Sequence, residues 1–248
     1  MVAAGQTGVA DMSRTGTTVP LGHQSDGELV QEFMDHWVAL SGDAWLALGG
    51  VDDVRRALAE AVSAMVSERG HAPRRVIAWA TDELAPLDLP GLLASLGCEC
   101  VWWTDHPGGA DVAGDHQDSP PGGPADEPAT PGAALSRRRN LAAASDLGIT
   151  TCAWAVADTG TIALYATPST GRLPSLLPTA HVALVRPSQI VRSVPDGLRV
   201  MANHGAQLGG LPSAVNLVSG PSRSADIEGD VAVGVHGPRR AGVVIGEW

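Results

Sequence analysis

A short alternation of strand, helix and strand in the first half of the chain constrains the fold most. Residues 75–80 form a compact apolar run, and residues 99–103 form a second strand-like run. Between them, residues 89–96 have a short helical pattern that ends at Gly97. Strands joined through one helix pair in parallel by a right-handed crossover. The alternation therefore predicts βαβ units and an α/β fold with a mostly parallel sheet.

The segments around this unit contain further candidate helices and strands. Apolar residues spaced three and four apart predict helices, and short apolar runs predict buried strands. The expected helices cover residues 26–38, 52–70 and 135–147, the last stopped by Gly148. The expected strands cover residues 44–48, 151–157, 161–166, 181–186, 214–218 and 241–245. Residues 158–160 separate two of these strands, as a tight hairpin turn or as a bend at a strand end.

Two segments differ in composition from the rest of the chain. In residues 105–134, twelve of 30 residues are Gly or Pro and six are acidic, so the segment cannot bury enough apolar surface to offset its ordering entropy. Residues 1–25 are rich in Gly, Thr and Ser and lack the apolar core of a signal peptide. We expect a disordered tail at 1–25 and one domain at 26–248 with a disordered insertion at about 105–134. Two domains joined by this segment are the alternative.

Charge and cysteine content exclude several classes of function. The net charge is −11, so binding of a nucleic-acid backbone is not expected. The three cysteines have neither zinc nor iron–sulfur spacing, so we expect no metal and no cofactor. An odd number of cysteines argues against a disulfide framework and fits a cytoplasmic protein. No run approaches the roughly 20 apolar residues that span a bilayer.

The segment from Val215 to Glu228 is the main candidate for a binding site. A predicted strand runs into the sequence Ser-Gly-Pro-Ser-Arg-Ser, and a helical turn is expected near Ala225. A glycine loop before a helix directs backbone N–H groups at an anion, and Arg223 adds a planar donor group. Alternatively, Arg223 pairs with Asp226 or Glu228 of the same segment and the serines cap the helix.

Three other segments carry residues with possible chemical roles. Asp158 could act as a general base or nucleophile, or simply accept backbone N–H bonds in a turn. Arg172 is the one charged residue between Ser169 and His181, which suggests a paired or ligand-facing role. His181 is more typical of a structural histidine. His236, in a glycine-flanked loop, is the best general acid or base by residue type.

These segments, in this order, resemble the lactate-utilization protein C family, the short form of the LUD domain. The similar pieces are Ala157–Thr161, Arg172-x-x-Ser175-x-x-Pro178-x-x-His181, Asn216–Glu228 and Gly234–Pro238. The resemblance implies a three-layer α/β/α sandwich similar to the sugar-phosphate isomerase and CoA-transferase group. Within these pieces, residue type and position make Asp158 and His236 the candidate catalytic residues. The candidate ligand-binding residues are Thr159, Gly160, Thr161, Arg172, Ser175, His181, Gly220, Ser222, Arg223, Ser224, Asp226 and Glu228.

The resemblance also implies a role in oxidising L-lactate to pyruvate together with iron–sulfur partner proteins. Family members often carry Glu where Asp158 stands, and the shorter side chain weakens a nucleophilic role. Two hypotheses follow: a component of the lactate system without its own redox centre, or a free-standing enzyme or binder of a small anion such as a sugar phosphate, a carboxylate or a CoA ester. The sequence leaves catalysis itself undecided.

Overall fold

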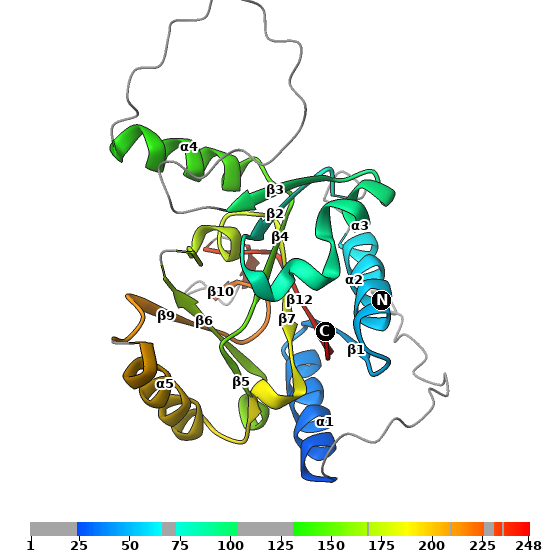
Figure 1. Cartoon of the computed structure of the whole chain (residues 1–248), viewed down its shortest axis with the longest axis vertical. Coiled ribbons are helices and arrows are strands. Elements are labelled where there is room, and N and C mark those ends of the chain that lie inside the picture. The colour runs from blue at the N-terminus through cyan, green and yellow to red at the C-terminus, as the bar shows by residue number, and fades with distance from the viewer. Residues whose placement is uncertain are drawn as a thin grey trace, which may run out of the picture.

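The computed structural model describes residues 24–65, 73–103, 131–167, 169–208, 210–225, 231–234 and 236–248. Most of the expected N-terminal tail and of the expected insertion lies outside these residues. A central sheet runs through the middle of the molecule (Figure 1). Helices α2 (Val51–Ala64) and α3 (Leu89–Ser95) lie on one side of it, and a second sheet with helix α5 (Val194–Leu208) lies on the other.

Six parallel strands form the central sheet. Their order across the sheet is β1-β12-β7-β4-β2-β3, and every neighbouring pair is parallel. The strands are β1 (Asp43–Ala47), β2 (Arg75–Trp79), β3 (Glu99–Trp103), β4 (Leu147–Thr151), β7 (Ala180–Val185) and β12 (Arg240–Gly246). This arrangement confirms the predicted α/β fold with a mostly parallel sheet.

The second sheet has four strands in the order β8-β5-β6-β9. These strands are β5 (Trp154–Val156), β6 (Thr161–Ala166), β8 (Ile190–Val191) and β9 (Ala214–Val218). β5 and β6 are antiparallel, so the residues between them form the tight hairpin turn that was one of the two sequence-based alternatives. Helix α5 packs on β5, and a Cβ atom on Gly197 would lie 2.4 Å from the ring of Trp154.

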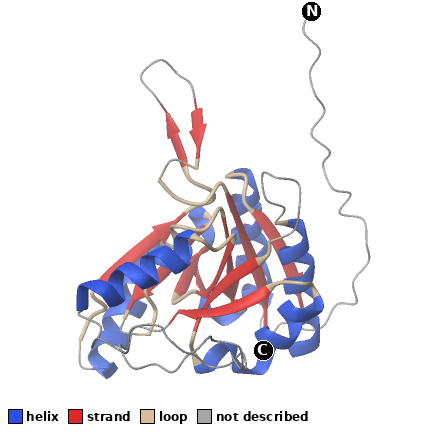
Figure 2. Ribbon diagram, turned by 90° about the horizontal axis from the view of Figure 1, so that it is seen from above, coloured by secondary structure: helices blue, strands red, loops and turns tan. Residues whose placement is uncertain are grey.

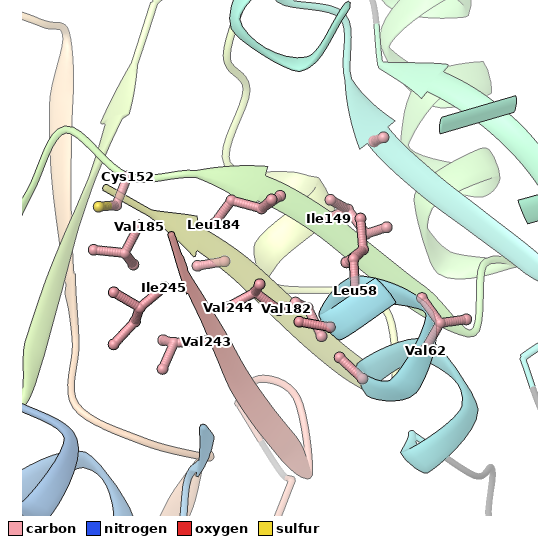
Figure 3. Close-up of a cluster of buried hydrophobic side chains, with 14 of the residues drawn as sticks. Leu58, Val62, Ile149, Cys152, Val182, Leu184, Val185, Val243, Val244 and Ile245 are labelled. Carbon is pink, nitrogen blue, oxygen red and sulfur yellow. The ribbon is translucent and has the colours of Figure 1, made fainter. Parts of the chain in front are cut away.

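The main core lies between the central sheet and its helices. All residues of β4 and β7 are buried, as expected for parallel strands covered on both faces. Leu58 and Val62 of α2 pack beside Ile149 and Val182 (Figure 3). Helix α1 (Gln24–Ala39) contacts β1 and the turn between β5 and β6. Of the described helices, none is both long and apolar enough to cross a bilayer.

Two local predictions are wrong. The helix expected to end at Gly148 is α4 (Pro131–Ala143), and Gly148 lies inside β4. A Cβ atom at this position would lie 1.8 Å from the carbonyl oxygen of Pro174, so glycine permits this close approach rather than ending a helix. Ala225, where a helical turn was expected to begin, lies instead in strand β10 (Arg223–Ala225). This strand pairs with β11 (Val231–Val233) in a hairpin that stands away from both sheets (Figure 2).

Candidate functional site

The order of the central strands points to one crevice at the sheet edge. After β2 the chain passes through α3 to the edge strand β3, whereas after β4 it continues to β7 on the other side. β2 and β4 are neighbours, so the connections that leave their carboxyl ends diverge. In open α/β sheets, ligands bind at such a divergence, outside the carboxyl ends of the strands. The crevice between β2 and β4 is therefore the first candidate site.

A cavity of about 190 Å³ lies at this position. Trp79 ends β2 and Thr151 ends β4, so both strand ends form part of the wall. Tyr165 of β6 and His204 of α5 contribute from the second sheet and its helix. The wall consists of Trp79, Thr81, Glu83, Thr151, Cys152, Ala153, Tyr165, Thr167, Thr170 and His204. We call this cavity the β2/β4 crevice.

Hydroxyl groups supply most of the polar character of the β2/β4 crevice. The Tyr165 hydroxyl accepts a hydrogen bond of 2.9 Å from Trp154 Nε1 and keeps its own proton. Burial raises the pKa of Tyr165, so its hydroxyl is a donor near neutral pH. Thr170 Oγ1 donates to the Tyr165 carbonyl and lies 2.7 Å from Thr167 Oγ1. The buried Thr81 hydroxyl has no partner among the described residues, which costs about 1–3 kcal/mol.

Charge at the crevice is concentrated on one wall. Glu83 Oε1 lies 3.7 Å from the guanidinium of Arg186, and both groups are partly exposed. Arg186 also stacks 4.0 Å above the ring of Trp248, whose Nε1 donates to the Glu83 carbonyl. These contacts hold the Glu83 backbone and the Arg186 side chain in one place. Glu83 thus brings to the wall a carboxylate that Arg186 partly neutralises.

Cys152 is the one thiol in the crevice wall. Burial raises its pKa, and the nearby Glu83 carboxylate raises it further, while Arg186 opposes this effect. The thiol lies 3.6 Å from Gln189 Oε1, to which it donates. Because the thiolate is the nucleophilic form of cysteine, this residue serves the wall as a small neutral group.

The turn at residues 158–161 lies against helix α1 and away from the crevice wall. Asp158 and Thr159 are exposed, whereas Thr161 is buried and its hydroxyl lies 2.7 Å from that of Ser219 and 2.9 Å from that of Thr159. Gly160 has a φ of +56°, and a Cβ atom there would lie 2.6 Å from the backbone nitrogen of Trp37. The contacts of Gly160 and Thr161 thus join the turn to α1 and to the loop after β9.

The loop after β9 lies beside the end of α1. Gly220 has a φ of +87°, and Arg223 donates a 2.6 Å hydrogen bond to the Leu40 carbonyl, just beyond the last residue of α1. The Ser222 N–H donates to the Pro238 carbonyl. His236 is exposed on the neighbouring loop. The Ser224 side chain, Asp226 and Glu228 lie outside the described part of the chain, so the alternative in which Arg223 pairs with one of these carboxylates stays untested.

The segment from Arg172 to His181 contributes mainly to the interior. Ser175 is buried and donates to the carbonyl of Arg172, whose own side chain is exposed. His181 is 1% exposed, and its Nε2 lies 2.9 Å from the hydroxyl of Thr150. Burial lowers the pKa of His181 to about 4. His181 is therefore neutral near pH 7 and is part of the core.

The predicted site residues lie at opposite edges of the central sheet. Arg223 holds the carbonyl of Leu40, which precedes the first residue of β1. Arg172 follows Gly171, whose carbonyl accepts from Trp79, the last residue of β2. The carboxyl edge holds the β2/β4 crevice, and the amino edge holds the loop after β9. Sequence reasoning missed the crevice, although Thr81 directly after a predicted strand was an available signal.

Among the described residues, no group of three or more His, Cys, Asp or Glu side chains is placed to hold a metal ion. The crevice instead offers hydroxyl groups, an aromatic ring pair and one carboxylate. The rings of Tyr165 and His204 lie 6.1 Å apart between centroids. Such a set binds and orients a small polar molecule through hydrogen bonds and ring contacts.

Comparison with known proteins gives one family and one fold. The LUD domain model matches residues 122–245. Lactate utilization protein C 1 of Bacillus mycoides is 43% identical over 105 residues, which are 42% of this chain and 45% of that protein. Lactate utilization protein C of Bacillus subtilis is 39% identical over 101 residues, 41% of this chain and 42% of that protein. The matched stretch thus spans less than half the length of these relatives.

A solved structure extends the similarity over most of the chain. A DUF162 family protein from Deinococcus radiodurans, solved as a crystal structure at 1.70 Å resolution, superimposes with a TM-score of 0.56. The superposition covers 92% of this chain and 99% of that chain, at 23% sequence identity. At this identity the likeness concerns the fold, and it includes the part of the chain before residue 122.

Proposed function

The chain belongs to the LUD domain family, and on that premise we propose that it serves in L-lactate utilization as a component without a redox centre of its own. The observation that carries this proposal is the identity of about 40% to proteins named lactate utilization protein C. The matched half of the chain contains β4, β7 and β12, three of the six central strands. It also contributes Thr151, Tyr165 and His204 to the wall of the β2/β4 crevice.

In this proposal, oxidation of L-lactate to pyruvate takes place with iron–sulfur partner proteins. The oxidation removes two electrons and two protons from lactate, and an acceptor must take the electrons. Iron–sulfur clusters are bound by thiolates. Burial raises the pKa of Cys98, raises that of Cys100 to about 11, and raises that of Cys152. The chain has three cysteines, whereas the common clusters take four thiolates, which supports placing the electron acceptor on partner proteins.

Gene deletion tests this role directly. A strain that lacks the chain should fail to grow on L-lactate as sole carbon source and should grow normally on glucose. A plasmid copy of the intact chain should restore growth on lactate. Affinity purification of the tagged chain should then bring down proteins that contain iron and acid-labile sulfide, and the tag alone should not. Unchanged growth of the deletion strain on L-lactate would contradict the proposal.

A second candidate function is the binding of a small anion by the loop at Gly220–Glu228. The exposed guanidinium of Arg223 supports it, because it donates one hydrogen bond to Leu40 and has further donors. Phosphate, pyruvate and acetyl-CoA are the probes in a thermal-shift assay. A ligand at 100 times its dissociation constant should stabilise the fold by about 2.7 kcal/mol. Arg223→Gln should abolish the thermal shift. The control Arg192→Gln alters an exposed arginine elsewhere and should retain the shift. No shift with any of the three probes would reject this function.

A further inference from the structure

We infer that helix α4 (Pro131–Ala143) is the docking surface for a carboxylate-rich face of a partner protein. This inference rests on the proposed role, in which iron–sulfur proteins are the partners, and adds the surface at which the chain meets them. It uses neither the β2/β4 crevice nor the loop after β9. Three features of α4 carry it: the exposure of the helix, its positive charge and the contrast with the net charge of the chain.

Helix α4 buries little of its surface. It lies at one end of the molecule, beyond β2 and β3 (Figure 1), and it contacts the 3₁₀ turn η3 (Leu173–Ser175). Among the described side chains from 135 to 143, only Ala142 is buried, and Leu135 is 59% exposed. An isolated helix of this length is marginal in water, and packing supplies most of the stability of helices in proteins. The open face of α4 is therefore available to pack against a second molecule.

Three consecutive arginines make α4 positively charged. Residues 131–143 contain Arg137, Arg138 and Arg139 but no Asp or Glu, so the helix has no carboxylate of its own with which they could pair at one-turn spacing. Arg137 and Arg139 are exposed, whereas Arg138 is partly buried. Two positions along a helix correspond to a rotation of about 200°. The two exposed arginines therefore lie on opposite flanks of the open face.

The exposed arginines of α4 differ from most other arginines of the described chain. Seven others form ion pairs with carboxylates, for example Arg75 with Glu99 at 2.8 Å. Within the described residues, Arg137 and Arg139 have no carboxylate partner. A guanidinium is a planar donor group that can bind a carboxylate through two hydrogen bonds. A carboxylate-rich protein surface would pair with donors that the described chain leaves exposed.

The charge of the whole chain favours a protein over a nucleic acid or a membrane. The net charge is −11. Nucleic acids and anionic lipid surfaces are charged along their whole extent, so the rest of the molecule repels them. A protein can present carboxylates locally and remain weakly charged elsewhere. Leu135 lies one turn before Arg139 and is exposed, and protein interfaces combine such apolar contacts with arginine.

Lysine substitutions can locate the partner. The chain contains no lysine, so the double variant Arg137→Lys/Arg139→Lys keeps the positive charge and introduces the first two lysine amines. The tagged full-length variant is purified from host cells grown on L-lactate and treated with a carbodiimide, which joins an amine directly to a carboxylate. Mass spectrometry should find position 137 or 139 linked to Asp or Glu of a protein that contains iron and acid-labile sulfide.

Matched variants measure the contribution of charge. Arg137→Gln/Arg139→Gln should lower the iron and acid-labile sulfide recovered with the tagged chain about tenfold, whereas the double lysine variant should retain most of the recovery. Arg56→Gln/Arg199→Gln removes two exposed arginines from α2 and α5, which changes the net charge equally, and should recover as much as the wild type. Raising the NaCl concentration from about 50 mM to about 300 mM should weaken recovery by the wild type, because salt screens exposed charges.

Several results would overturn the inference. The first is that positions 137 and 139 form no link to an iron–sulfur protein, or link only to the chain itself or to a second copy. The second is unchanged recovery by Arg137→Gln/Arg139→Gln when circular dichroism shows that this variant is folded. The third is binding of double-stranded DNA or phosphatidylglycerol vesicles by the wild type that the same variant abolishes.

Failure of the inference is distinguishable from failure of the proposed function, because growth on L-lactate tests the function separately. If the deletion strain cannot use L-lactate and Arg137→Gln/Arg139→Gln recovers the partners fully, the role stands and the assignment of α4 fails. If an iron–sulfur protein links to position 137 or 139 but the deletion strain grows normally on L-lactate, the docking surface stands and the proposed role fails.

Discussion

The buried imidazole of His181 should make the stability of the protein depend on pH. Its pKa falls from 6.5 to about 4 on folding because the ring is buried. The folded state therefore favours the neutral ring, and this contribution is fully present above pH 6.5 and is lost as the pH falls toward 4. Linkage gives a total loss of about 3 kcal/mol, of which about 2 kcal/mol is lost between pH 7.5 and pH 5.

Urea unfolding at pH 7.5 and pH 5 measures this loss. Other groups also titrate in this range, so the informative quantity is the difference between wild type and His181→Gln. The variant has no imidazole here, and its free energy of unfolding should fall by ~2 kcal/mol less than that of the wild type. Thr150→Val is the control, because it removes the hydrogen-bond partner of His181 and retains the buried ring. This control should be less stable at both pH values but keep the full pH dependence.

Equal losses in wild type and His181→Gln would refute the reasoning, since they would mean that the ring is charged or solvated in the folded state. A loss of the pH dependence in Thr150→Val would instead show that the hydrogen bond, rather than burial, sets the pKa of His181. Because the variants are compared at the same two pH values, differences in overall stability cancel from the comparison.

Two further predictions concern packing and the thiols. Gly171→Ala should lower the free energy of unfolding by about 1–3 kcal/mol, because its Cβ atom would lie 2.3 Å from the Trp103 indole nitrogen. The control is Gly210→Ala, whose Cβ atom would have no atom within 4 Å. This control should change the free energy of unfolding little in the same urea assay. The second prediction concerns Cys98, Cys100 and Cys152. Because burial raises all three thiol pKa values, the native protein at pH 8 should react slowly with Ellman's reagent. It should release three equivalents of thionitrobenzoate only in denaturant. A fast-reacting thiol in the native protein would contradict this prediction.

The sequence was sufficient for five of the six central strands and for β5, β6 and β9 of the second sheet. It missed β4, because Gly148 suggested the end of a helix, and it missed β8. Strands buried on both faces, such as β2 and β7, appear as continuous apolar runs. β8 has two residues and β10 three, too few for a periodic pattern. Helix α5 was not among the expected helices, and its sequence contains Pro195 and two glycines, residues of low helix propensity. Proline is tolerated in a first helical turn, and Gly197 is needed for contact with Trp154.

The β2/β4 crevice was not found from local sequence because its wall comes from distant segments. Thr81, Thr151, Tyr165 and His204 each follow or belong to a different element. A hydroxyl residue after a predicted strand is common, and only the order of the strands shows that two such positions meet. That order depends on pairings such as β4 with β2 and β7, which are tertiary contacts.

The segment Val215–Glu228, the main candidate site in the sequence, lies at the other edge of the sheet, and packing explains Gly220 and Arg223. Gly220 has a positive φ and lies close to the Leu40 carbonyl, and Arg223 binds that same carbonyl at the end of α1. Strands of five residues rise roughly 16 Å, so the loop after β9 and the β2/β4 crevice are separate surfaces. Changes at Arg223 and at Thr151 should therefore act independently, and the free-energy effects of the two substitutions should add. Gly220 and Arg223 can therefore serve the packing of the end of α1 independently of the β2/β4 crevice at the opposite edge.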